Sequence, residues 1–121
     1  MTKLWLYSYE VLNGTEIGEE IAYLLENVYY SAIGDLRDRY TTQSKAGWIA
    51  AYEEPAETEE GEEETNVILR YYSSSNDAGI IYSDKGPYVM VILSDIPSSL
   101  ERITPLVNVL DEVHQEMVSS Q

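Results

Sequence analysis

Two apolar runs joined by a turn signal form the clearest pattern of hydrophobic and polar positions in the chain. Residues 78–82 and 88–93 are almost continuously apolar, and the polar segment 83–87 separates them. Gly86 can adopt the positive φ that a tight turn needs, and Pro87, which has no N–H to donate, suits the first residue of a strand. The pattern predicts an antiparallel hairpin whose long second strand is buried on both faces near its middle, because residues 89–93 scarcely alternate between apolar and polar residues.

Three other segments have the character of strands. Residues 3–12 alternate partly between two faces, and residues 45–52 and 66–72 are rich in apolar and aromatic side chains. β-Branched and aromatic residues favour strands, so we expect each of these segments to join the hairpin. The polar residues 41–44 are expected to be a connector, and residues 73–76 a turn or bulge.

The N-terminal half also contains a helical pattern. Thr15 is a candidate N-cap, and the apolar residues that follow it recur at helical spacing over about residues 16–30: Ile17, Ile21, Leu24, Leu25 and Val28. Residues 32–40 could add a short helical turn, with Arg37 and Arg39 exposed. We interpret the nearby Asp and Arg residues as surface pairs that contribute little to stability.

The last helix is predicted over about residues 98–118, from an apolar stripe that includes His114: Leu100, Ile103, Val107, Leu110, His114 and Met117. Pro105 interrupts the pattern. We favour a bent continuous helix, and the alternative is a helix that Thr104 caps and whose first residue is Pro105.

These elements predict a single α+β domain over residues 1–121. We expect an antiparallel sheet of about four or five strands, covered by the helix of the N-terminal half and by the C-terminal helix, because each helix has one apolar stripe with which to cover a sheet.

The charge is strongly negative and unevenly distributed. Seven Lys and Arg residues face 22 Asp and Glu residues, for a net charge of −15. Nucleic acid and anionic membrane surfaces are therefore poor partners. Residues 53–64 contain eight acids and no base. They predict a flexible, solvated acidic loop at 53–65, without the spacing of a calcium-binding loop.

Several kinds of site are excluded or disfavoured by composition. There is no cysteine, so disulfides, thiolate metal sites and a cysteine nucleophile are absent. No apolar run approaches the roughly 18 residues needed to span a bilayer, so we expect no membrane insertion.

The candidate metal ligands and aromatic residues have structural interpretations. No second residue that could bind a metal ion lies at a suitable spacing from His114, and we expect neither a metal nor a cofactor. Tryptophan and tyrosine side chains are expected to pack in the core and across strands: Trp5, Trp48, Tyr72, Tyr82 and Tyr88.

One ordered set of motifs points to a known family. Lys45, Ala46 and Gly47 lie on a predicted strand, and N-D-A-G-I-I-Y at 76–82 and G-P-Y-V-M-V-I-L at 86–93 follow. This order resembles the C-terminal part of the penicillin-recognising serine hydrolases, the class A β-lactamase-like family. In that family an edge strand with K-T-G or K-S-G borders the active site, strands similar to these two follow it, and a terminal helix covers the sheet. The match extends over roughly residues 13–118, with a gap before Lys45 and the acidic insertion after Tyr52; its upstream part rests on residues 13–15 and 24–29, which are similar to a helix of the family.

The resemblance implies a chemistry and also a gap in it. In the family a serine attacks a carbonyl, a lysine three residues later activates that serine, and the K-T-G strand binds the substrate carboxylate. Lys45 matches the lysine of that strand and Gly47 its glycine, whereas Ala46 replaces the hydroxyl residue and cannot donate its hydrogen bond. Neither S-x-x-K nor S-D-N occurs in the 121 residues. The resemblance thus implies a truncated or degenerate sheet lobe that lacks the catalytic serine and is non-catalytic on its own, in an extracytoplasmic setting.

Other interpretations remain open. Lys45 could simply be an edge lysine that discourages strand pairing, and Gly47 a bulge or packing glycine.

The whole chain has three possible interpretations. In the first, it is one part of a serine hydrolase that acts on β-lactams or peptidoglycan peptides when joined to a missing helical lobe. It predicts a large uncovered apolar surface. A second reading is a standalone module that binds a protein or forms a homo-oligomer. It predicts a well-covered monomer or a symmetric dimer through the tyrosine-rich strands, and it is favoured if a strand at 4–11 pairs beside 88–93. A third is a small α+β protein with a fortuitous resemblance.

Overall fold

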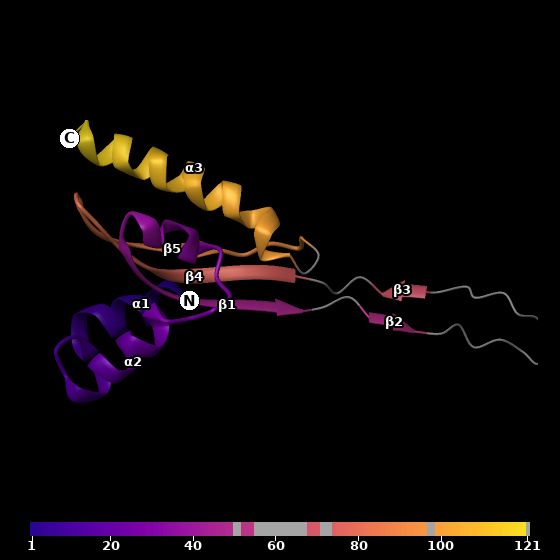
Figure 1. The fold of residues 1–121 in the computed structure, drawn as a ribbon, viewed down its shortest axis with the longest axis horizontal. Helices are drawn as coiled ribbons and strands as arrows, with labels where there is room; N and C mark the ends of the chain where they lie inside the picture. Colours follow the sequence, from indigo (N-terminus) through magenta and orange to yellow (C-terminus); the bar gives the residue numbers. More distant parts are fainter. Residues whose placement is uncertain (50–51, 55–67, 71–73, 97–98, 121) are drawn as a thin grey trace, which may run out of the picture.

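A computed structural model describes residues 1–49, 52–54, 68–70, 74–96 and 99–120, and Figure 1 shows their arrangement. The central sheet has three antiparallel strands in the order β1 (Thr41–Ile49), β4 (Ser74–Ser83) and β5 (Gly86–Ile92). Two short strands, β2 (Tyr52–Glu54) and β3 (Ile68–Arg70), pair with each other in a second sheet. The α+β class is confirmed, but the central sheet has three strands among the described residues and not four or five.

The predicted hairpin is confirmed as β4 and β5, with Ser83 opposite Gly86 and two residues in the turn between them. Gly86 has a φ of 114°, a conformation that glycine adopts without a Cβ clash. The expected burial is wrong, however. β4 is the strand buried on both faces, over Asp77 to Ile81, while β5 buries only Met90 and Ile92. The reason is that β4 lies in the middle of the sheet, with β1 on one side and β5 on the other.

β1 begins at Thr41, so the polar residues expected to form a connector belong to the strand. Thr42, Gln43 and Ser44 are buried in it. Gln43 donates a 2.9 Å hydrogen bond from Nε2 to Oε1 of Glu26, and the hydroxyls of Ser44 and Ser31 lie 2.7 Å apart. Polar side chains can occupy a buried strand when each finds a partner, and hydrophobic patterning alone does not predict such a strand.

Helices cover both faces of the sheet. On one side, called here the α2 face, lie α1 (Thr2–Tyr7), the π-helical turn η1 (Ser8–Leu12) and α2 (Glu16–Glu26). On the other, the α3 face, lie the 3-10 helix η2 (Ile33–Asp38) and α3 (Leu100–Ser119), and Figure 1 shows the two sets of helices on opposite sides of the strands. The larger core is on the α3 face and contains these buried residues: Ala32, Ile33, Leu36, Ile81, Met90, Ile92, Ile103 and Val107.

The predicted N-terminal strand is wrong, because α1 and η1 occupy residues 2–12. Trp5 is buried with Ala78 and Ile80 on the α2 face, and Tyr9, one turn later, packs against the same cluster. Trp5 and Tyr9 are four residues apart, a spacing that places them on one side of a helix as well as on one face of a strand. Within the described residues β5 therefore pairs with β4 alone.

The other helical predictions are largely confirmed. Thr15 caps α2 by accepting a 3.0 Å hydrogen bond from the Gly18 N–H, although α2 ends at Glu26 rather than near residue 30. The short turn expected at 32–40 is η2. α3 runs continuously through Pro105, and the Thr104 hydroxyl donates to the Leu100 carbonyl at 3.1 Å, so Thr104 does not cap a later helix.

The predicted acidic loop at 53–65 lies outside the described residues, except for Glu53 and Glu54 in the backbone of β2. No helix in the described part of the chain is both long enough and apolar enough to cross a membrane.

Candidate functional site

The strand β1 carries the three residues that the sequence singled out. Lys45 lies opposite Ala78, Ala46 opposite Asp77 and Gly47 opposite Asn76. Because successive side chains in a strand point to opposite faces, Ala46 lies on the α3 face, where it is buried, and Lys45 and Gly47 share the α2 face, where both are exposed. The structure thus brings Lys45 and Gly47 together and separates Ala46 from them.

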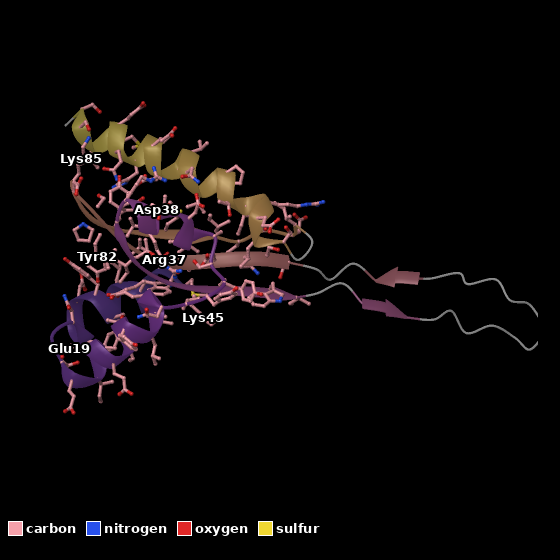
Figure 2. The ribbon with its side chains drawn as sticks, in the orientation of Figure 1. Glu19, Arg37, Asp38, Lys45, Tyr82 and Lys85 are labelled. Carbon is pink, nitrogen blue, oxygen red and sulfur yellow. The ribbon has the colours of Figure 1, made fainter. Side chains whose placement is uncertain are left out.

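The side of β1 away from β4 pairs with no other strand among the described residues. We call the stretch Lys45, Gly47, Trp48 and Ile49 the β1 edge; all four of its residues are exposed. Figure 2 shows Lys45 on the side of the strands where α1 and α2 lie. An unpaired strand edge presents backbone N–H and C=O groups to which an extended ligand can bind.

The charge of Lys45 is available at this edge. Its ammonium group donates to the carbonyl of Ala46, and the one ion pair recorded among the described side chains joins Arg39 to Asp111, so Lys45 has no carboxylate partner among them. A Cβ placed on Gly47 would meet no atom within 4 Å, so close packing does not explain this glycine, and its unbroken register with Asn76 shows no bulge there. The strand beside Lys45 is open to the approach of another molecule.

Aromatic side chains lie at the end of the same strand, where Trp48 shares the face of Ala46 rather than that of Lys45 and Gly47. Trp48 is 50% exposed and Tyr30 61% exposed, and their rings meet edge to face with centroids 5.9 Å apart. Tyr29 adds a second edge-to-face contact to Tyr30 at 4.8 Å. The prediction that Trp48 packs in the core is therefore wrong, while Trp5 is buried as expected and Tyr72 lies outside the described residues.

A buried carboxylate, which sequence reasoning did not identify as a site, supports β1 from the α3 face. Asp77 is 1% exposed, and its Oδ2 accepts hydrogen bonds from the Ser31 hydroxyl at 2.8 Å and the Ile33 N–H at 3.0 Å. Since the single hydroxyl proton of Ser31 goes to Asp77, Ser44 is the donor in its contact with Ser31. The signal in the sequence is an Asp inside an apolar strand, a residue type that is seldom buried without partners.

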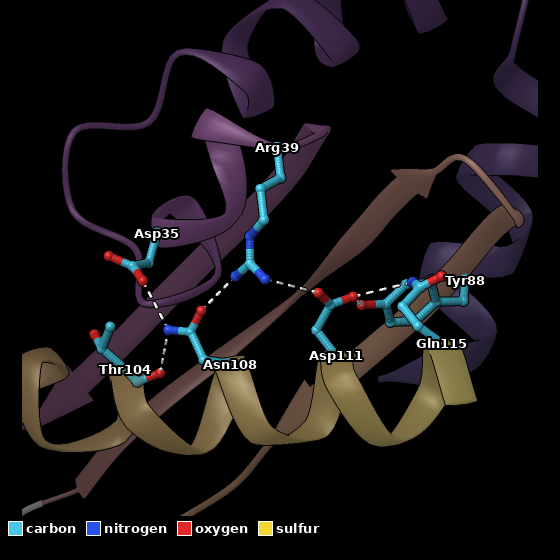
Figure 3. Close-up of polar contacts among 7 residues, drawn as sticks. All are labelled: Asp35, Arg39, Tyr88, Thr104, Asn108, Asp111 and Gln115. Carbon is cyan, nitrogen blue, oxygen red and sulfur yellow. Dashed lines mark hydrogen bonds and ion pairs between the residues drawn. The ribbon is translucent and has the colours of Figure 1, made fainter. Parts of the chain in front are cut away.

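A second buried carboxylate, that of Asp111, connects α3 to Arg39 and to β5 (Figure 3). Asp111 is 1% exposed and accepts from Arg39 at 3.2 Å, from the Tyr88 hydroxyl at 2.6 Å and from Gln115 at 3.1 Å. Burial and, after it, the hydrogen bond to Asp111 raise the pKa of Tyr88 above its ordinary value. Arg39 is exposed as expected, but its pair with a buried partner makes it more than a surface charge.

Among the residues that the structure describes, the arrangement presents a cation that can bind an anion but no available nucleophile beside Lys45. Ser44 is its sequence neighbour, yet the Ser44 hydroxyl is completely buried on the opposite face and is used in the hydrogen bond to Ser31. Acyl transfer needs a hydroxyl within hydrogen-bonding reach of its base and open to substrate. The described side chains also contain no group of three or more residues suited to hold a metal ion.

Lys45 and Gly47, exposed on one face of a strand that is at the edge of the described sheet, therefore form the candidate site. Comparison of the chain with models of protein families, with curated proteins and with solved structures gives no match.

Proposed function

We propose that this chain is the sheet lobe of a fold similar to the penicillin-recognising serine hydrolases, in which Lys45 binds the carboxylate of a substrate at the β1 edge. The lobe has no acyl-transfer activity on its own. The observation that carries the proposal is the placement of Lys45 and Gly47 side by side on one exposed face of an unpaired strand edge.

The order of elements supports the proposal. The resemblance implies an edge strand with the lysine, then two antiparallel strands of the N-D-A and G-P-Y-V types, then a helix on the sheet. β1, β4 and β5 are neighbours in that order, β1 lies at the edge, and α3 follows on the face opposite Lys45. A ligand carboxylate at Lys45 would gain a charge-assisted hydrogen bond from the ammonium group, and the adjacent glycine leaves room for the ligand backbone.

The uncovered surface of α1 and α2 supports a second lobe. Large apolar side chains there are exposed: Leu4 by 68%, Ile17 by 67% and Leu24 by 61%. Ile17 and Leu24 are seven residues apart and so lie on one side of α2, and contiguous exposed apolar surface is a feature of interfaces. A well-covered standalone module does not predict these exposures, and the N-terminal strand that would have favoured such a module is a helix. We infer that a helical lobe packs against α1 and α2 and completes a cleft along β1.

Titration with a peptide carboxylate tests the proposal. Acetylated D-alanyl-D-alanine and its C-terminal amide are titrated by calorimetry into the wild-type chain and the Lys45→Gln and Lys3→Gln variants. An exposed ion pair contributes up to about 1 kcal/mol, so the acid should bind about fivefold more tightly than the amide. Lys45→Gln should abolish the difference. Lys3→Gln, which removes an exposed charge on α1, should preserve it.

Equal binding of acid and amide to the wild-type chain, or an unchanged preference in Lys45→Gln, would refute the assigned role of Lys45. The absence of chemistry has its own test: after incubation with a penicillin, the intact mass of the chain should be unchanged. A stoichiometric adduct on a serine would show that a nucleophile is present.

A further inference from the structure

The turn between η1 and α2 has an Asn-Gly pair at its centre. Asn13 and Gly14 are both exposed. Asn13 has a φ of −59° and a ψ of 129°, and Gly14 has a φ of 78°. The Thr15 N–H donates to the Leu12 carbonyl across them at 3.0 Å. These angles and this hydrogen bond are those of a type II β-turn, with glycine at the position that requires a positive φ.

This pair of residues can react with itself to form a cyclic imide. The deprotonated backbone nitrogen of Gly14 attacks Cγ of Asn13, the new N–C bond replaces the bond from Cγ to the amide nitrogen, and ammonia leaves. Water then opens the five-membered ring. Cleavage at Cγ gives aspartate at position 13, and cleavage at the main-chain carbonyl gives isoaspartate, in which the chain runs through the side chain. Glycine favours the attack because no Cβ crowds its nitrogen.

The other described asparagines lack the features that favour this reaction. Each is followed by a residue with a Cβ, and two of those residues are β-branched valines, which crowd the nitrogen further. The amide of each makes a hydrogen bond: Asn27 to the Tyr23 carbonyl at 2.7 Å, Asn76 with the Ser94 N–H at 3.0 Å, and Asn108 to Asp35 at 2.7 Å. No hydrogen bond within the described part of the chain restrains the amide of Asn13.

The reaction requires the turn to open. In the imide, Cβ of Asn13 and the Gly14 nitrogen lie on the same side of the Cα–C bond, whereas a ψ of 129° turns the nitrogen away from the side chain. Rotation about this bond breaks the contacts that the Thr15 N–H and hydroxyl make with the Leu12 carbonyl at 3.0 and 2.6 Å. The turn is exposed, so it can open without unfolding of the core.

We propose that Asn13 is a site of spontaneous deamidation through the imide with Gly14, and that isoaspartate there detaches the start of α2 from η1. Isoaspartate adds one carbon to the main chain, which moves Thr15 away from the Leu12 carbonyl. Thr15 also caps α2, and a Cβ on Gly18 would lie only 1.8 Å from the same carbonyl oxygen, so the first turn of α2 packs directly on it. The β1 edge has no part in this inference, which does not depend on the proposed function.

Incubation of the purified chain at mildly alkaline pH tests the proposal. Mass spectrometry of proteolytic peptides should find both aspartate and isoaspartate at position 13. Asn27, Asn76 and Asn108 should be unchanged in the same sample. Asn13→Gln should not convert, because its longer side chain cannot form the five-membered ring. The chain unfolded in guanidinium should react at position 13 about tenfold faster, because the two hydrogen bonds to the Leu12 carbonyl no longer restrain the turn.

Hydrogen exchange tests the consequence for α2. In the isoaspartate form, separated by chromatography, the Gly18 amide should exchange about fivefold faster than in the wild type, because it loses its bond to the Thr15 cap. Freshly prepared Asn13→Asp is the matched control. It adds the same charge without changing the path of the main chain, and it should exchange like the wild type.

The proposed site would be overturned if the folded chain did not convert within about ten times the period that converts the unfolded chain. Conversion of the other three asparagines at the same rate would also overturn it. Aspartate without isoaspartate at position 13 would show direct hydrolysis rather than the imide. Unchanged exchange at Gly18 in the isoaspartate form would contradict the detachment of α2.

Discussion

At the scale of single residues, two buried carboxylates fix the α3 face. Asp77 connects the start of η2 to the central strand, and Asp111 connects α3 to Arg39 and β5. A buried charge is tolerated only when hydrogen bonds replace its lost hydration, and each of these carboxylates has at least three. Asp77 also positions Ser31 and, through it, Ser44 next to Lys45. Asp77 thus supports β1 from the face opposite Lys45.

Replacement of Asp77 by Ala should destabilise the chain by about 3 kcal/mol, because the buried Ile33 N–H and Ser31 hydroxyl lose a charged acceptor. Asp77→Asn keeps one oxygen for these donors and should cost less. Urea denaturation followed by circular dichroism measures both free energies of unfolding. If Asp77→Ala were as stable as Asp77→Asn, the hydrogen bonds to Oδ2 would not have the role assigned to them.

The environment of Tyr88 predicts a loss of stability at high pH. Burial and the Asp111 carboxylate raise the pKa of Tyr88 in the folded chain above the ordinary value of about 10. As pH rises, the unfolded chain loses this proton first, so the stabilisation is fully present below about pH 10 and is lost above it. In Tyr88→Phe the free energy of unfolding should fall less steeply above about pH 10 than in the wild type. Parallel slopes would contradict this account. Burial also raises the pKa of Tyr82, so some dependence on pH remains in the variant.

At the scale of elements, β1, the edge strand that carries Lys45, approaches β4 closely. A Cβ on Gly79 would lie 2.4 Å from the Gln43 carbonyl oxygen of β1, closer than atoms can approach. We expect Gly79→Ala to push the strands apart and to cost about 2 kcal/mol of stability. Gly47→Ala is the matched control on β1, where the added methyl group meets open space. Thermal unfolding should show a lower midpoint for Gly79→Ala alone, and equal midpoints would contradict the close approach.

The hairpin and the two longer helices could be predicted from sequence because the residues that determine them are close together in the chain. The turn residues around Gly86 predict the hairpin, Thr15 predicts the start of α2, and the stripe with Ile103 and Val107 predicts α3. Each depends on neighbours within a few positions along the chain.

What could not be predicted depends on tertiary contacts. The spacing of Trp5 and Tyr9 is compatible with a strand and with a helix. In the structure the segment is helical and packs both side chains against the cluster with Ala78 and Ile80, a contact that the local pattern does not predict. Ser44 resembles a loop residue until its partner Ser31, 13 positions away, is known. At the candidate site, the lysine and glycine could be named from their motif. Their shared face and the burial of Ala46 required the register of β1 with β4.

At the scale of the whole molecule, the described part of the chain exposes large apolar side chains on both sides of its sheet. One set, on α1 and α2, lies on the face with Lys45, and the other, Leu106, Leu110, Val113 and Met117 of α3, lies on the opposite side. A net charge of −15 opposes the burial of either surface between two copies. Exposed apolar surface of this kind is a feature of interaction sites, and the surface on α1 and α2 is the one that we propose a second lobe covers.

The most direct test of the account is to map a bound peptide carboxylate on the chain by NMR. With acetylated D-alanyl-D-alanine, we expect the amide signals of Lys45, Gly47 and Trp48, and of Asn76 opposite Gly47, to shift in the wild type and to stay unchanged in Lys45→Gln. The signals of α3 should not move in either. Shifts confined to another surface, or the same shifts at the β1 edge in Lys45→Gln, would contradict the assignment of this edge as the ligand site.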